Sequence, residues 1–162
     1  MAQGFHGVVT GLRESPGLNI VRVAHQPGQR IATHSHDWPC LTLHRCGSYV
    51  ERVDGAELFI DRPAAAYHPA GCAHANTVGP YGLETVSILF DPSILPAEDA
   101  LPLAAGRIWI GGRIGRLGSI VANELTVGRA QAAEIIGAFL RSAFALPASP
   151  KKPAWLERLD EY

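Results

Sequence analysis

Three histidines are the side chains in this sequence best suited to shared chemistry: His34, His36 and, much later in the chain, His74. Residues i and i+2 of a β-strand point to the same face of a sheet, so the imidazoles of His34 and His36 would face one space. His74 follows a Pro-x-Gly turn, which would bring a third imidazole back to that space. Three converging imidazoles can bind a divalent metal ion, or they can hydrogen-bond to a polar ligand with no metal present. The residues alone leave both alternatives open.

Three further side chains are candidates for the same pocket. Cys40 shares the phase of His34 and His36 if the strand alternates, and its thiolate would make a softer metal site that suits zinc, nickel, copper or ferrous iron. His44 has the same phase and either lines the pocket or is structural. Trp38 is either a stacking wall at the mouth of the pocket or a half-exposed core aromatic.

The remaining titratable groups are expected outside the site. We interpret His6 and His25 as surface or strand-edge groups, and His68 as the neighbour of a turn. We predict no general acid–base pair near the histidines, because neither spacing nor phase groups three glutamates of residues 1–96 with them. These three are Glu51, Glu57 and Glu84.

Bulk composition favours one soluble domain in the cytoplasm. The chain has 162 residues, of which 47% are hydrophobic, which is enough for one core. Its formal net charge of −1 gives no basic surface for nucleic acid. It contains no apolar run long enough to span a membrane and no pattern of a secretion signal. Three cysteines, an odd number at spacings typical of no disulfide framework, are expected to be reduced thiols.

Hydrophobic periodicity divides the chain into three parts. Over residues 1–96, short β-favouring runs separated by Gly, Pro, Asn and Asp predict a mainly β sandwich or barrel. Apolar residues then recur at three- and four-residue intervals in 113–125 and 129–146, which predicts two amphipathic helices. We therefore assign 97–146 to a helical hairpin packed on the barrel or at a dimer interface. Residues 147–162 are expected to form a proline-rich linker and the start of another helix.

The spacing of the histidines resembles the two signature motifs of the cupin superfamily, Gly-x5-His-x-His-x3-4-Glu-x6-Gly and Gly-x5-Pro-x-Gly-x2-His-x3-Asn. The matching residues here are Gly28, His34, His36, Cys40 and Gly47, then Pro69, Gly71, His74 and Asn76. The sequence departs from the motifs in three places: Cys40 replaces the glutamate, Pro63 replaces the leading glycine of the second motif, and Asn76 comes early. The resemblance implies a jelly-roll-like β-barrel in which the three histidines and the residue at position 40 are the metal ligands.

Over residues 18–162 the order of segments also resembles the N-terminal half of an AraC-type transcriptional regulator. The segments that carry this resemblance are His34-Ser35-His36-Asp37, Gly47-Ser48-Tyr49, His68-Pro69-Ala70-Gly71, Leu89-Phe90-Asp91-Pro92 and Lys152-Pro153-Ala154-Trp155-Leu156-Glu157-Arg158. The family implies a barrel that binds a small effector, a helical hairpin that forms a homodimer, and a DNA-binding half. Only seven residues follow Trp155, too few for a helix-turn-helix, so we expect no direct binding of nucleic acid by this polypeptide. The missing half would belong to a longer protein, or the gene product would be naturally short.

These observations lead to one main hypothesis and two alternatives. The main hypothesis is an effector-sensing and dimerisation domain of an AraC-type regulator, in which His34, His36, Trp38, Cys40, His44 and His74 contact the ligand. A divalent ion, if present, would be zinc, nickel or iron held by His34, His36, Cys40 and His74. The first alternative is a metal-dependent cupin enzyme of the dioxygenase or isomerase type. The second is a metal-free binding or assembly module.

Overall fold

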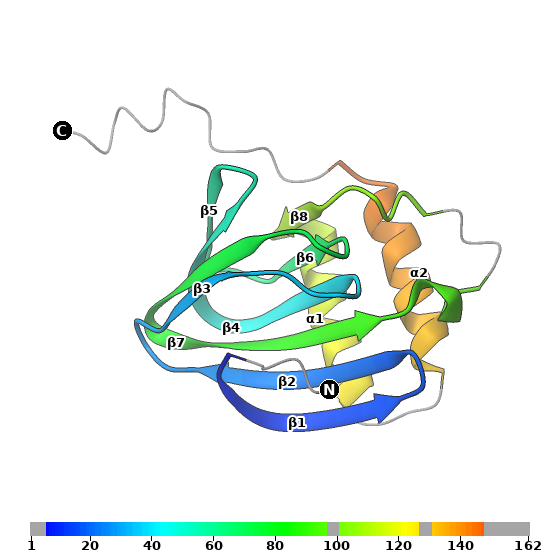
Figure 1. Cartoon of the computed structure of the whole chain (residues 1–162), viewed down its shortest axis with the longest axis horizontal. Helices are drawn as coiled ribbons and strands as arrows, with labels where there is room; N and C mark the ends of the chain where they lie inside the picture. Colours follow the sequence, from blue (N-terminus) through cyan, green and yellow to red (C-terminus); the bar gives the residue numbers. More distant parts are fainter. Residues whose placement is uncertain (1–5, 97–100, 127–130, 148–162) are drawn as a thin grey trace.

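Eight antiparallel strands form one strongly curved sheet, and two helices lie against one side of it (Figure 1). The fold is seen in a computed structural model, which describes residues 6–96, 101–126 and 131–147. The strands are β1 (Val8–Ser15), β2 (Leu18–His25), β3 (Arg30–His34), β4 (Cys40–Val53), β5 (Ala56–Ile60), β6 (Ala64–His68), β7 (His74–Phe90) and β8 (Arg107–Ile110). A 3-10 turn, η1 (Pro92–Ile94), follows β7, and the helices are α1 (Gly112–Thr126) and α2 (Ala132–Phe144).

The predicted fold class, a mainly β domain followed by two helices, is confirmed. The sheet order is β1-β2-β7-β4-β6-β8, with β3 added beside β7 and β5 beside β4. The structure places β8 after residue 96, inside the range that the sequence assigned to the helical hairpin, and pairs it with β6. The segment predicted as linker lies outside the described residues, apart from its first residue. Of the helices in the described part of the chain, none is long and apolar enough to cross a membrane.

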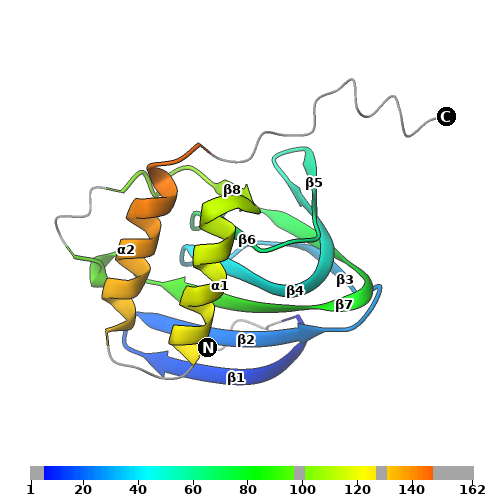
Figure 2. The same ribbon diagram turned by 180° about the vertical axis from the view of Figure 1, so that it is seen from behind.

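Strand alternation separates two environments. Leu41 and Leu43 on β4 are fully buried in the main apolar core, which the helices α1 and α2 complete from outside (Figure 2). Their neighbours Cys40 and Thr42 line a cavity on the other face. Phe139 of α2 is 2% exposed within the helix-side core. The face that meets the helices therefore provides the main apolar packing, while the concave face combines polar side chains with a second, smaller apolar cluster that includes Tyr49 and Leu83.

The long strand β4 changes phase in its middle. Its pairing with β7 shifts register between His44 and Cys46, and again between Gly47 and Tyr49. Gly47 has a φ of 88°, and any side chain there would overlap the backbone carbonyl of Gly82 on β7. Glycine at this position therefore permits the irregularity, which bends the strand and re-aims the side chains beyond it.

Candidate functional site

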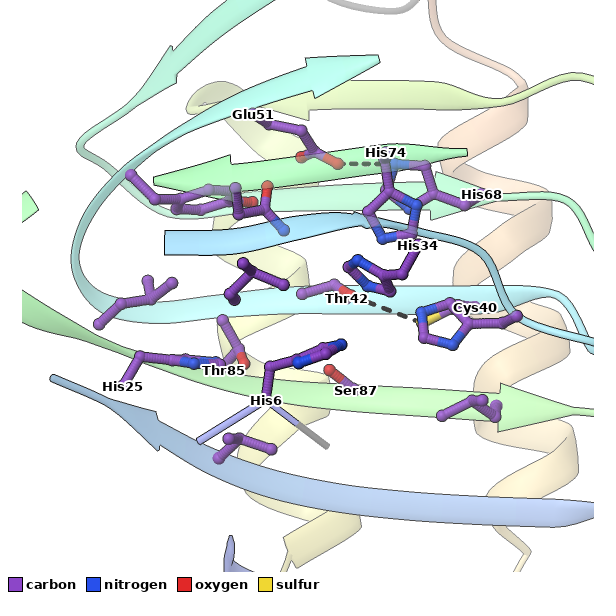
Figure 3. Close-up of a pocket in the computed structure, with 17 residues that line it drawn as sticks. His6, His25, His34, Cys40, Thr42, Glu51, His68, His74, Thr85 and Ser87 are labelled. Atoms are coloured by element: carbon purple, nitrogen blue, oxygen red, sulfur yellow. Dashed lines mark hydrogen bonds and ion pairs between the residues drawn. The ribbon is translucent and has the colours of Figure 1, made fainter. Parts of the chain in front are cut away.

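The concave face of the sheet encloses a cavity of about 70 Å³, which is room for an ion and a few waters or for a small polar molecule. Strands β2, β3, β4, β6 and β7 all contribute to its wall (Figure 3). The lining residues are His6, Val23, His25, Ile31, His34, His36, Cys40, Thr42, Tyr49, Glu51, His68, His74, Asn76, Leu83, Thr85, Ser87 and Leu89.

The structure brings together the three histidines singled out in the sequence. His34 ends β3 and pairs directly with His74 at the start of β7, which places their ring centroids 4.3 Å apart. The ring of His36 lies 5.1 Å from that of His34 and 5.4 Å from that of His74. One nitrogen from each of the three rings lies within 4.8 Å of the others. These three atoms can therefore surround a single ion.

The turn before His74 helps to position this group. The Gly71 N–H donates a hydrogen bond of 2.8 Å to the carbonyl oxygen of His36, and the Cys72 N–H donates one of 3.1 Å to that of Pro69. Gly71 has a φ of 75°, a conformation that glycine adopts without strain. The Pro-x-Gly turn thus ties the segment after β3 to the start of β7.

Backbone carbonyls fix the orientation of two of the rings. The Nδ1 atoms of His34 and His74 lie 2.9 Å and 3.1 Å from the carbonyl oxygens of Ala32 and Cys72. A carbonyl oxygen only accepts, so each Nδ1 carries the proton, and the lone pair is left on Nε2. This arrangement is typical of metal-binding histidines, in which the nitrogen that does not bind the metal is held by a hydrogen bond.

The cavity keeps these histidines neutral. Burial, together with the neighbouring imidazoles, lowers the pKa of His36 to about 4 and that of His74 to about 3. Burial also lowers the pKa of His34 below its ordinary value. Because metal ions bind the neutral imidazole, no proton has to be displaced from these rings near pH 7.

Two further residues, Glu51 and His68, occupy the deep end of the cavity. Glu51 is 1% exposed and His68 is 3% exposed, and Oε1 of Glu51 lies 2.7 Å from Nε2 of His68. The ring of His68 stacks on that of His74 with centroids 4.2 Å apart and an interplanar angle of 7°. Glu51, His68 and His74 form a second group whose ligand atoms lie within 4.8 Å of one another.

These positions correct the expectation that the glutamates lie away from the histidines. Upstream of the irregularity in β4 the cavity-facing residues are Cys40 and Thr42, and downstream they are Tyr49 and Glu51. An uninterrupted alternation would have turned Glu51 outward. Glu84 on β7 does lie away from the histidines, because its carboxylate forms ion pairs with Arg22 and Arg45 outside the cavity.

The interpretations of three other histidines are also corrected. His68 is a buried cavity residue on β6, where it pairs with Cys40, rather than only the neighbour of a turn. His6 and His25 both line the cavity, although His6 is exposed, and the ring of His6 lies 4.8 Å from that of His34. Sequence spacing alone could not predict that these histidines line the cavity, because pairing between strands that are distant in the sequence brings them together.

Cys40 lines the cavity, but the structure does not group its sulfur with the histidine nitrogens. In the described part of the chain, no cluster of three or more potential ligands within 4.8 Å includes Cys40. Its Sγ lies 3.6 Å from Oγ1 of Thr42, and burial raises the pKa of the thiol to about 12. Because the thiolate is the form that binds a metal, an ion at Cys40 would have to displace the thiol proton.

The two other predicted ligand contacts lie outside the cavity. The His44 ring is buried beside Tyr49, with Nε2 2.9 Å from the carbonyl oxygen of Gly47. Trp38 is 36% exposed and lines a separate shallow depression together with Pro69 and Cys72. Neither is among the residues that line the histidine cavity.

Comparisons with known proteins yield structural neighbours of low sequence identity. The fold is similar to a cupin superfamily protein from Desulfitobacterium hafniense, with 18% identity over 54% of this chain and 82% of that chain, and a TM-score of 0.47. A cupin 2 conserved barrel domain protein from Leptotrichia buccalis is 21% identical over 52% of this chain and 40% of that chain, with a TM-score of 0.47. An RmlC-like cupin protein from Desulfovibrio desulfuricans is 21% identical over 52% of this chain and 82% of that chain, with a TM-score of 0.45. No family model and no curated protein matches the sequence.

Proposed function

We propose that the chain is a cupin domain that binds a small polar effector at a divalent metal ion held by His34, His36 and His74. The observation that carries the proposal is the convergence of three imidazole nitrogens within 4.8 Å in one cavity. The pKa values of all three imidazoles are lowered, so their lone pairs are available at neutral pH.

The donor set fits zinc, nickel or ferrous iron, because imidazole nitrogen is a common ligand of each. A bound ion would supply a positive charge and free coordination positions for an anionic or polar effector. His34 and His36 are only partly buried, so an effector can approach the ion from their side. With about 70 Å³ available, the effector is a small molecule rather than a peptide or a long sugar.

We further propose that this domain is the sensing and dimerisation half of an AraC-type regulator. The order of segments described above supports the assignment, and so does the position of the helices, which cover the outer face of the strands that line the cavity. Arg45 of β4 links the sheet to helix α1. Its Nε lies 2.6 Å from Oε1 of Glu84 on β7, and its Nη1 donates to Oδ1 of Asn123 on α1. A ligand that favours one position of β4 would therefore also change the preferred position of α1.

A second copy of the chain is the proposed partner of the helices. Ile120 on α1 is 60% exposed, although it is a large apolar side chain. We expect light scattering to show a dimer at micromolar concentration, and we expect Ile120→Glu to shift it toward monomer. A wild-type monomer at that concentration would contradict the dimerisation part of the proposal and leave the metal site untouched.

Metal binding is tested on protein purified without a histidine tag. We expect one equivalent of zinc or cobalt to bind, as measured by calorimetry and by elemental analysis after desalting. His6→Ala is the matched control, because His6 lines the cavity but belongs to neither ligand group. If wild type binds no divalent ion, the proposed function is wrong.

A metal-dependent enzyme is the second candidate, and the Glu51–His68 pair favours it. A buried carboxylate 2.7 Å from an imidazole, next to His74, is the acid–base pair that the sequence did not predict. Oxygen uptake or product formation with iron-loaded protein and small carbonyl or enol substrates tests this role. Turnover that is lost in Glu51→Gln and kept in the surface variant Glu57→Gln would favour the enzyme.

A further inference from the structure

We propose that Glu51, His68 and His74 form a second, inner position for a divalent cation, so that the cavity holds one ion in either of two positions. The outer position is the one formed by His34, His36 and His74. The inference extends the proposed function and rests on it in one respect, that this cavity binds a divalent ion.

Three strands deliver the inner ligands to one point. Glu51 comes from β4, His68 from β6 and His74 from β7, and their ligand atoms lie within 4.8 Å of one another (Figure 3). All three side chains are buried, with exposed fractions of 1%, 3% and 5%. A carboxylate with two imidazoles is a ligand set that divalent zinc, iron and cobalt accept.

Three polar atoms of this group have no hydrogen-bond partner within the described protein. Oε1 of Glu51 and both ring nitrogens of His68 are buried and have no hydrogen bond, although Oε1 and Nε2 are only 2.7 Å apart. Their contact therefore lacks the geometry of a hydrogen bond. Buried polar groups that remain unpaired are costly, and a cation between these atoms would satisfy both.

The two positions cannot be filled together, because they share His74. The Nδ1 atom of His74 is held by the carbonyl oxygen of Cys72, which leaves one nitrogen with a lone pair. One lone pair binds one ion, so the positions exclude each other. The inner position adds the negative charge of Glu51 and is closed to solvent, whereas the outer position has three neutral ligands and is partly open.

The charge of Glu51 makes the inner position the tighter one for a free divalent ion. The experiment is a titration of the full chain with Co²⁺, followed by its visible absorption, and with Zn²⁺ by calorimetry. The inner variants are Glu51→Gln and, as a second choice if that one folds poorly, His68→Gln. The outer variant is His34→Ala combined with His36→Ala. Glu57→Gln is the matched control, because Glu57 is an exposed glutamate on β5.

We expect wild type to bind one equivalent, and the outer variant to bind one equivalent within about tenfold of the wild-type affinity. Glu51→Gln should weaken binding by more than tenfold, Glu57→Gln should leave it unchanged, and His74→Ala should abolish it. The inner and outer variants should also differ in their cobalt spectra, because their ligand sets differ.

Each other result overturns the inference in a recognisable way. If the outer variant loses all metal and Glu51→Gln binds like wild type, only the outer position exists and the proposed function stands. If both variants lose metal equally, a single ion contacts all five side chains. Two equivalents in wild type would contradict the sharing of His74, and no binding in wild type would remove this inference and the proposed function together.

Discussion

The two faces of the sheet carry opposite chemistry although the same strands build them. On β4, Leu41 and Leu43 are fully buried in the helix-side core, while the alternate residues Cys40 and Thr42 face the cavity. The helix side is continuous apolar packing. The cavity side contains unpaired buried polar atoms, such as Oε1 of Glu51. Stability is therefore expected to come mainly from one face and binding from the other.

The sharpest test of this separation is Phe139→Ala. The ring is 2% exposed in the helix-side core, so its loss should lower the free energy of unfolding by about 3–5 kcal/mol. Urea denaturation measures this, and Phe59→Ala, at a phenylalanine of β5 that is 60% exposed, should cost less than about 0.5 kcal/mol. The folded fraction of Phe139→Ala should bind metal like wild type. Lost binding in that fraction would mean that the two faces do not act separately.

The reciprocal test is His34→Ala combined with His74→Ala. Metal affinity should fall by more than a hundredfold, about 2.7 kcal/mol, because both proposed positions lose a ligand. The free energy of unfolding of the metal-free protein should change by only about 1 kcal/mol, because the apolar core is untouched. Thermal melting in the presence of a chelator checks this. Aggregation or early melting of the double variant would show that the histidines hold the fold.

Acid is expected to lower the free energy of unfolding through the histidines of the cavity. Burial keeps the pKa of His36 at about 4 and that of His74 at about 3, below the ordinary value of 6.5. Between pH 6.5 and 4 the unfolded chain takes up protons at these positions and the folded chain does not, so stability falls as pH decreases. We expect a loss of about 2 kcal/mol in metal-free protein between pH 7 and 4, after allowing for water that reaches the partly exposed ring of His36.

Denaturation at several pH values measures this slope. His36→Gln combined with His74→Gln should flatten it, because glutamine does not titrate. An unchanged slope in that variant would assign the acid sensitivity to other groups.

The smallest effect is expected for Cys40→Ala. Its sulfur belongs to neither ligand group, so metal affinity should stay within about twofold of wild type, which is about 0.4 kcal/mol. Loss of a small buried side chain should cost about 1 kcal/mol of stability. Calorimetry with zinc and urea denaturation measure the two quantities. A tenfold loss of affinity would restore Cys40 as a ligand.

Local patterns predicted most of the fold. Alternation and turn residues indicated the strands, and three- and four-residue spacing indicated α1 and α2 within a few residues of their observed ends. Strand β8 was not predicted, because four residues between turns carry too little periodicity to distinguish a strand from a loop. Its place in the sheet is set by pairing with β6, which is distant in sequence.

The site was predictable only where its residues are close in sequence or lie in a recognisable motif. His34 and His36 share a face by spacing, and His74 follows its turn. Glu51 could not be placed, because the phase of β4 changes at a register shift that depends on β7. His68 could have been placed only by knowing that it lies opposite Cys40 on the neighbouring strand. Gly47 was the one local hint that β4 is irregular.

Because of the irregularity in β4, the side chain at the floor of the cavity, its deep end, depends on the number of residues between Thr42 and Tyr49. The stretch between Thr42 and Tyr49 holds one residue more than regular alternation allows, so deleting one residue would remove the irregularity and leave Glu51 facing the cavity. Deleting two residues would instead turn Glu51 toward solvent and Arg52 toward the interior. An insertion or deletion in this short stretch could thus exchange an acidic floor for a basic one without any substitution in the strand itself.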